Sequence, residues 1–147
     1  MSDPLQSLTA PHNLEYTYKR SLGPVLGKFF TALRDRRILG VRREDGTIMV
    51  PPKEYDPNSG GAISEMVEVA DHGSVVTWAW VNEPRPSQPL PHPFAYALIQ
   101  LDGADTPLLH VIDSGTEDAV KTGMRVRARW ATETTGAITD IHCFEPC

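Results

Sequence analysis

Three arginines lie two residues apart in the stretch MRVRARWA, at Arg125, Arg127 and Arg129. Successive side chains of a β-strand point to opposite faces, so this spacing predicts a strand with a row of guanidinium groups on one face and an apolar opposite face. Such a row is typical of a solvated sheet surface. It also suits a phosphate-bearing ligand such as coenzyme A, or an acidic protein partner. The sequence leaves these three interpretations open.

Single-stranded nucleic acid is a fourth ligand to consider, because Trp78 and Trp80 offer aromatic faces on which bases stack. The formal net charge of −5 and an aromatic content of 7% argue against it, since nucleic-acid binding usually requires a basic surface. We keep a nucleic-acid-binding protein as an alternative function.

The other polar residues form no visible catalytic constellation. The sequence lacks a G-x-S-x-G motif, a P-loop and a G-x-G-x-x-G motif. His110 and Asp113 have the types and spacing of a base and its orienting carboxylate, but such pairs are more often structural. His142 and Cys143 are neighbours in a predicted strand and point to opposite faces, which argues against a shared metal ion. We therefore expect no catalytic residue.

Length and composition indicate one globular domain with a small appendage, because 147 residues are enough to bury a core. The only cysteines are Cys143 and Cys147, too few for a disulfide framework, so we expect a reducing, cytoplasmic environment. No stretch approaches the roughly 18 consecutive apolar residues of a membrane span. The first residues do not have the pattern of a signal peptide.

The segment SLGPVLGKFFTALRDRR predicts an amphipathic helix. Pro24 suits the first helical position, where a missing N–H costs nothing, and apolar residues recur at helical spacing. The apolar stripe contains Phe29, Phe30 and Leu33. It packs either on the chain's own domain or on a partner protein, and we take these three residues as candidate partner contacts.

From Ile63 onward the pattern changes to short strands separated by turns, including a hairpin around His72–Gly73. The apolar run FAYALIQLD predicts a central strand that is buried on both faces. The order of the strands, with one short helical connector, predicts a small closed barrel of the OB-fold type. The stretch EPRPSQPLPHPF predicts a polyproline II loop, in which Pro89 and Pro91 are further candidate partner contacts.

The order of these features resembles the DUF35 family, the OB-fold proteins associated with acyl-CoA enzymes. The resemblance rests on the helix GPVLGKFFTALRDRRILGVR, the segment VPPKEYDP and the barrel motifs PFAYALIQLDGAD, LLHVID and TGMRVRARW, from about Tyr18 to Glu145. It implies a mainly β protein. Its expected parts are an N-terminal tail and helix at 1–36, a rubredoxin-like ribbon at 37–62 and an OB-fold barrel at 63–147.

The ribbon segment lacks the cysteines that the resemblance implies. The first knuckle, usually Cys-x-x-Cys-Gly, falls around Arg43 to Gly46, and the second, usually Cys-Pro-x-Cys-Gly, falls on the sequence Asp-Pro-Asn-Ser-Gly at 56–60. Structural zinc requires four converging N, S or O ligands, and carboxylates on solvated turns are a poor set. We expect a metal-free ribbon held together by packing of Ile48, Val50 and Tyr55.

The resemblance also implies a function. Members of the family typically act as non-catalytic partners of thiolase-like enzymes, and the barrel motifs are closest to the partners of steroid side-chain aldolases. The main hypothesis is thus an accessory subunit, in a hetero-oligomer, of a retro-aldolase in cholesterol or bile acid breakdown. A thiolase or acyltransferase partner outside steroid metabolism is an alternative. We expect a CoA thioester as substrate of the complex, no cofactor in this chain, and no contact with nucleic acid or membrane.

Overall fold

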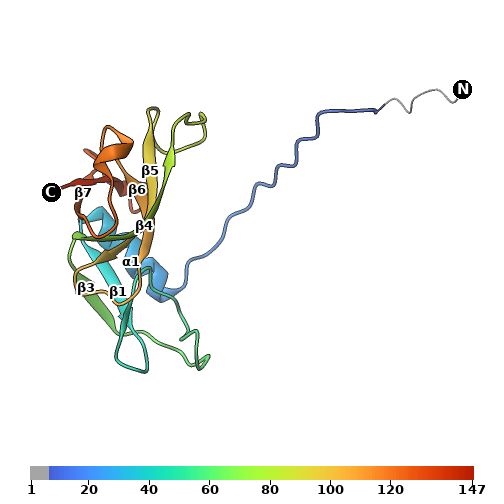
Figure 1. Ribbon diagram of the computed structural model, residues 1–147. Helices are drawn as coiled ribbons and strands as arrows, with labels where there is room; N and C mark the ends of the chain where they lie inside the picture. The colour runs from blue at the N-terminus through green and yellow to red at the C-terminus, as the bar shows by residue number, and fades with distance from the viewer. Residues whose placement is uncertain (1–6) are drawn as a thin grey trace, which may run out of the picture.

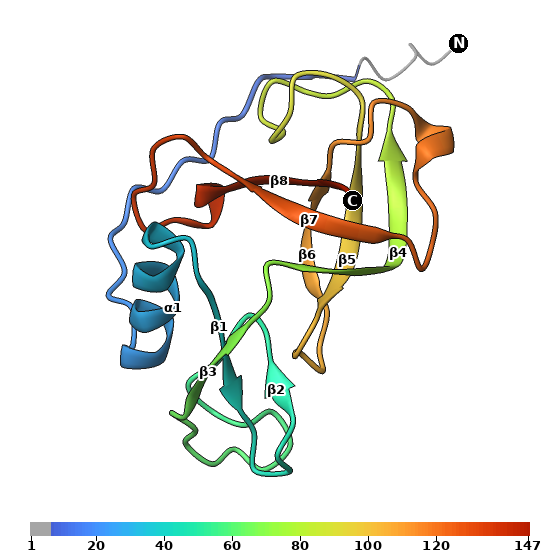
Figure 2. The same ribbon diagram turned by 90° about the vertical axis from the view of Figure 1, so that its left-hand side faces the viewer.

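The computed structural model describes residues 7–147, which form one α-helix, a small three-stranded sheet and a closed five-stranded barrel (Figures 1 and 2). The helix is α1 (Pro24–Arg34). The small sheet has the strand order β2-β1-β3, with β1 (Ile38–Arg42), β2 (Ile48–Met49) and β3 (Met66–Val69). The barrel has the order β4-β5-β6-β8-β7, with β4 (His72–Val81), β5 (Phe94–Leu101), β6 (Leu108–Ile112), β7 (Arg125–Trp130) and β8 (Ile141–Pro146).

Two short 3-10 helices connect barrel strands, η1 (Glu117–Ala119) between β6 and β7 and η2 (Ile138–Asp140) before β8. All strand pairs in the barrel are antiparallel except β6 and β8, which meet in parallel at Ile112 and Phe144. These features confirm the predicted mainly β fold with an OB-like barrel. Within residues 7–147, no helix has the length and apolar character needed to cross a bilayer.

The barrel core is formed by the inward faces of the strands. Ile99, Ile112 and Phe144 are essentially inaccessible to solvent and belong to the main core cluster, and such alternation is what a half-buried strand requires. Gly73 lies where β4 pairs with both β5 and β7. A Cβ atom at this position would lie 2.1 Å from the carbonyl oxygen of Gln100, so only glycine permits this approach of the two backbones.

The predicted hairpin around His72–Gly73 is wrong. β3 and β4 are consecutive in sequence, but β3 pairs with β1, from Ile38↔Val69 to Val41↔Met66, and belongs to the small sheet. His72 and Gly73 are the first residues of β4 and pair with β5 and β7. The chain therefore crosses from one sheet to the other at this point instead of turning back.

The expectation that the run FAYALIQLD is buried on both faces is also wrong. In β5, Ala95, Ala97 and Ile99 are buried, whereas Tyr96 and Leu98 are only partly buried on the outer face of the barrel. Leu109 on the neighbouring strand β6 pairs with Leu98 and is 62% exposed. The outer surface around Leu98 and Leu109 is consequently apolar and accessible to solvent.

The helix α1 begins where its sequence signals predict and is capped by a distant residue. Pro24 occupies the first turn, and no side chain at the N-cap position accepts a hydrogen bond. Instead, Glu54 Oε1 accepts the backbone N–H groups of Val25 and Leu26 at 3.0 and 3.2 Å. A carboxylate is favourable at a helix N-terminus, so this contact ties the helix to the segment that follows β2.

Candidate functional site

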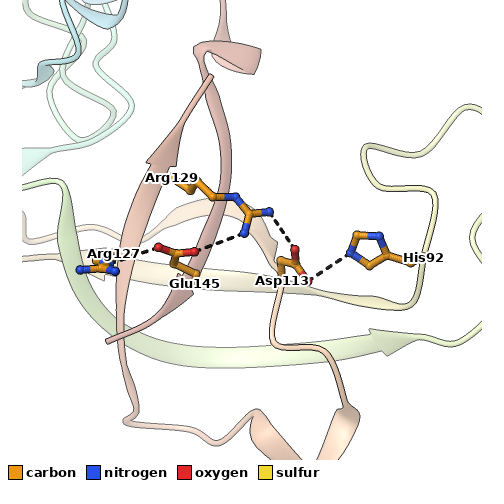
Figure 3. A network of polar contacts seen from close by, with 5 residues as sticks. All are labelled: His92, Asp113, Arg127, Arg129 and Glu145. Atoms are coloured by element: carbon orange, nitrogen blue, oxygen red, sulfur yellow. Dashed lines mark hydrogen bonds and ion pairs between the residues drawn. The ribbon is translucent and has the colours of Figure 1, made fainter. Parts of the chain in front are cut away.

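The predicted arginine row lies on β7, and carboxylates from other strands pair with it (Figure 3). Arg129 contacts Asp113 at 2.8 Å and Glu145 at 3.2 Å, and Arg127 Nε contacts the second oxygen of Glu145 at 3.2 Å. His92 of the proline loop lies 3.1 Å from the other oxygen of Asp113. The loop, the end of β6, β7 and β8 thus meet in one polar network.

The charges within this network compensate one another. Burial disfavours ionisation of Asp113, but hydrogen bonds from Arg129 and His92 outweigh it, so the pKa of Asp113 lies below its usual value. Arg125, the third arginine, forms a bidentate pair with Asp102, and its hydrogen bonds lower the pKa of that carboxyl group as well.

The three arginines therefore do not form a row of unpaired cations. Arg127 is the most exposed of them, with 61% of its side chain accessible, and within residues 7–147 only its Nε has a protein partner. A phosphate-bearing ligand would meet Arg127 first. The coenzyme A contact that we expect from Arg125, Arg127 and Arg129 remains a prediction, and its test rests on Arg127.

The two knuckle turns are joined by the carboxylate of Asp56, which is only 3% exposed. Its Oδ2 accepts the backbone N–H of Glu44 at 3.0 Å, and its Oδ1 accepts that of Asn58 at 2.8 Å. The hydrogen bond from Asn58, then that from Glu44, holds the pKa of Asp56 below its usual value. The guanidinium of Arg43 lies 3.8 Å from Oδ1.

This arrangement does not fit a zinc ion. Both oxygens of Asp56 already accept hydrogen bonds from the two turns, and a cationic side chain lies beside them at Arg43. Within residues 7–147, no three His, Cys, Asp or Glu side chains are grouped as a metal site. Zinc binding at a structural site requires four converging ligands, so the donors present are unsuited to the metal that the resemblance implies.

The candidate partner contacts on α1 divide into buried and accessible side chains. Phe29 and Leu33 are 1% and 0% exposed and belong to the main core cluster. Truncating a buried Phe to Ala costs about 3–5 kcal/mol, so the two residues stabilise this chain itself. The expectation that Phe29 and Leu33 contact a partner is thereby corrected. Phe30 is half-buried against the same cluster and keeps some accessible surface.

Pro89 and Pro91 remain accessible on the proline loop, whereas Leu90 between them is buried. Leu90 packs with Phe94, Val111 and Cys143 in a small cluster of its own. The loop is thus anchored to the barrel by one apolar side chain, and by the contact of His92 described above. The prolines are presented on a fixed surface, and their role as partner contacts remains a prediction.

His110 and Asp113, which have the types of a base and an orienting carboxylate, are not paired with each other. Asp113 contacts His92 and Arg129, whereas His110 is largely buried against Phe144, and burial lowers the pKa of its imidazole. Cys143 is completely buried, and burial raises the pKa of its thiol to about 11. Neither the imidazole nor the thiol is arranged as a base or nucleophile.

Sequence reasoning missed an apolar cavity of about 300 Å³ on the outside of the barrel, beside η2. Its lining includes Tyr96, Leu109, Val111, Ile138 and Ile141. The sequence feature that could have indicated this cavity is Leu109 in the stretch PLLHVID, because strand alternation places this apolar side chain on the outer face. This cavity and the adjoining outer face of β5 at Leu98 form an apolar region on the outside of the barrel.

The fold and these sites define an OB-fold protein with a short helix and a small three-stranded sheet, and comparisons with known proteins agree on the OB-fold. Residues 66–131 match the family described as "ChsH2, C-terminal OB-fold domain". A DUF35 domain-containing scaffold protein of Pyrococcus furiosus is 26% identical over 102 residues, which cover 69% of this chain and 74% of that protein.

Two solved structures share the fold. A DUF35 protein of unknown function from Sulfolobus solfataricus is 25% identical, with a TM-score of 0.58, over 72% of this chain and 78% of that one. A chain of the Ltp2-ChsH2(DUF35) aldolase is 23% identical, with a TM-score of 0.64, over 87% of this chain and 98% of that one. These matches confirm the predicted resemblance to the DUF35 family and its fold.

Proposed function

We propose that this chain is a non-catalytic accessory subunit of a hetero-oligomeric enzyme complex. The observation that carries the proposal is the fold match to a chain of the Ltp2-ChsH2(DUF35) aldolase, which covers 98% of that chain. The description of the Pyrococcus furiosus relative as a scaffold protein supports the same role. We further propose that the partner is a thiolase-fold retro-aldolase that acts on an acyl-CoA in steroid side-chain breakdown.

The chemistry of the described residues supports a non-catalytic role. Of the residues considered above as base, orienting group or nucleophile, His110 is largely buried, Cys143 is completely buried, and Asp113 is engaged in an ion pair with Arg129. A subunit of this kind would contribute by contacts with its partner, and the CoA thioester would be bound by the complex. We propose that this chain itself holds neither zinc nor another cofactor.

Single-stranded nucleic acid is less well supported as a ligand. OB-folds that bind it combine a positively charged groove with exposed aromatic faces. Here all three arginines of β7 have carboxylate partners, and the chain carries a formal charge of −5. We therefore keep nucleic-acid binding only as an outcome to be checked.

The test is coexpression of the full chain with a thiolase-like protein. The proposal predicts a stable hetero-oligomer that cleaves a β-hydroxyacyl-CoA, while this chain alone has no activity. Copurification with nucleic acid instead of a thiolase-like protein would support the alternative. Turnover of an acyl-CoA by this chain alone, in a preparation free of thiolase-like protein, would refute the accessory role.

A further inference from the structure

The segment 7–22, here called the arm, leaves the folded body ahead of α1 and contains neither helix nor strand (Figure 1). Its apolar side chains are open to solvent, with Leu14, Tyr16 and Tyr18 67%, 78% and 80% exposed. Within residues 7–147, no hydrogen bond joins the arm to the body. A chain seldom exposes several large apolar side chains so close together unless another surface covers them.

The arm has the residue pattern of a β-strand. In the stretch NLEYTYK, Leu14, Tyr16 and Tyr18 alternate with polar residues, at the period of two that places all three side chains on one face. Tyrosine and threonine also favour extended strands. A single strand is not stable in water by itself, so this pattern requires a sheet edge with which the backbone can pair.

Most strand edges of the described body already have a partner. The five-stranded barrel is closed, and of β4 only the part beyond Val75 pairs with a single strand, β5. The outer edge of β2 is already occupied. The N–H of Asp105 donates to the carbonyl oxygen of Ile48, and its carboxylate accepts the N–H of Ile48. The hydroxyl of Thr106 accepts the N–H of Val50 and donates to its carbonyl oxygen. Among residues 7–147, β3 keeps one unpaired side and the second half of β4 pairs with β5 alone, but the arm pairs with neither in this structure.

We propose that residues 13–19 add as a β-strand to an exposed sheet edge of the partner subunit. Leu14, Tyr16 and Tyr18 would then lie in apolar depressions along that edge, while Glu15, Thr17 and Lys19 face solvent. In this mode of recognition the backbone hydrogen bonds supply affinity and the alternate side chains supply specificity. The inference rests on the proposed accessory function, because it assigns one surface of that complex.

The first test removes the arm or its apolar face from the full chain coexpressed with the thiolase-like partner. Deleting residues 2–19, or changing Tyr16→Ala with Tyr18→Ala, should weaken partner binding at least about tenfold. The matched variant Glu15→Ala with Lys19→Ala should bind like the unmodified chain. Because residues 7–22 are exposed and no hydrogen bond of the described residues joins them to the body, none of these changes should alter the melting temperature of the isolated chain, so a loss of binding cannot be attributed to unfolding.

The second test distinguishes strand addition from contacts of side chains alone. Proline has no N–H and interrupts pairing only where that N–H faces the partner strand. Single prolines at consecutive positions 14–18, each compared with alanine at the same position, should therefore weaken binding at every second position. A loss that is equal at all five positions, or absent at all five, would overturn strand addition.

Other outcomes separate this inference from the proposed function. If the thiolase-like protein binds the unmodified chain and the deletion variant equally well, the arm inference fails and the accessory function stands. If the thiolase-like protein binds neither the unmodified chain nor the deletion variant, the proposed accessory function is refuted, and the arm inference that rests on it is refuted as well. The isolated chain could instead be a dimer that the deletion converts to a monomer. The arm would then bind a second copy of this chain, for example along the free side of β3, and the inference would be overturned.

Discussion

Asp56 and Glu44 are 12 residues apart in sequence, and Oδ2 of Asp56 accepts the backbone N–H of Glu44 at 3.0 Å. This contact joins the two turns at which the resemblance places zinc knuckles. The other oxygen of the same buried carboxylate holds the N–H of Asn58 in the second turn. One carboxylate therefore makes the connection between the turns that four thiolates and a metal ion would otherwise make.

We predict that Asp56→Asn lowers the melting temperature on the order of 5 °C. The amide has one oxygen in place of two acceptors, so one buried N–H loses its partner, and an unpaired buried donor is costly. The control is Glu44→Gln, which removes a negative charge from the same turn and keeps the backbone donor. Equal melting temperatures for Asp56→Asn and the unmodified protein would show that the carboxylate does not hold the turns.

The difference in free energy of unfolding between the unmodified protein and the Asp56→Asn variant should also depend on pH. The pKa of Asp56 is lower in the folded chain than in the unfolded one, so its contribution is complete above the unfolded value of about 3.9 and is lost as the pH falls through the folded value. Denaturant unfolding at a series of pH values should show the difference narrowing on acidification. A difference that widens in acid would contradict this assignment.

We predict that the purified protein carries no stoichiometric zinc and that a chelator leaves its melting temperature unchanged. The physical reason is that the oxygens of Asp56 are engaged with N–H donors and lie beside the Arg43 cation. Elemental analysis of protein grown in zinc-supplemented medium tests this directly. About one zinc per chain, lost in the Asp56→Asn variant, would overturn the prediction.

We predict that Phe30→Asp lowers the melting temperature, because Phe30 packs edge-on against Phe29 at 5.3 Å and against the core cluster. Placing a carboxylate in an apolar contact of this kind typically costs about 1–3 kcal/mol. Lys28→Asp, at an exposed position of the same helix, is the control for charge. Capture of the partner by each variant, measured well below the melting temperatures of both variants, shows whether the accessible part of Phe30 also contacts the partner. A variant that keeps full stability and full capture would refute both roles.

We predict that Arg127→Glu raises the KM of the assembled complex for its acyl-CoA and leaves assembly intact. Arg127 is the most exposed arginine of β7, and among residues 7–147 nothing is hydrogen-bonded to its two terminal nitrogens, which suit a phosphate. Arg37→Glu, at an exposed ion pair with Glu68 on the small sheet, is the matched control. If KM changes equally in both variants, or in neither, Arg127 does not contact the phosphates of coenzyme A.

Local patterns predicted the elements that depend on local sequence. The helix around Pro24, the strand of alternating arginines and the barrel class all follow from periodicity. The pairing of β3 with β1 could not be predicted in this way, because it joins Val41 to Met66 across a segment without regular spacing. The crossing at Gly73 was mistaken for a turn, since a glycine in a turn and a glycine at a close backbone approach look alike in sequence.

The site residues show the same limit. The absence of cysteines from the ribbon was visible in the sequence, but Asp56 was considered only as a poor metal ligand, because its hydrogen bonds depend on a turn 12 residues away. His92 and Asp113 are 21 residues apart and meet only because the proline loop folds back onto the barrel. Likewise, the burial of Phe29 and Leu33 was one of two outcomes that an amphipathic stripe allows.

The most direct test of the account is to coexpress the full chain with a thiolase-like protein and to measure both the mass of the purified species and its cleavage of a β-hydroxyacyl-CoA. We expect a hetero-oligomer that splits the substrate into a carbonyl compound and a shorter acyl-CoA, and no turnover by this chain alone. A chain that purifies by itself from the coexpression, or that turns over acyl-CoA without any thiolase-like protein present, would contradict the central claim.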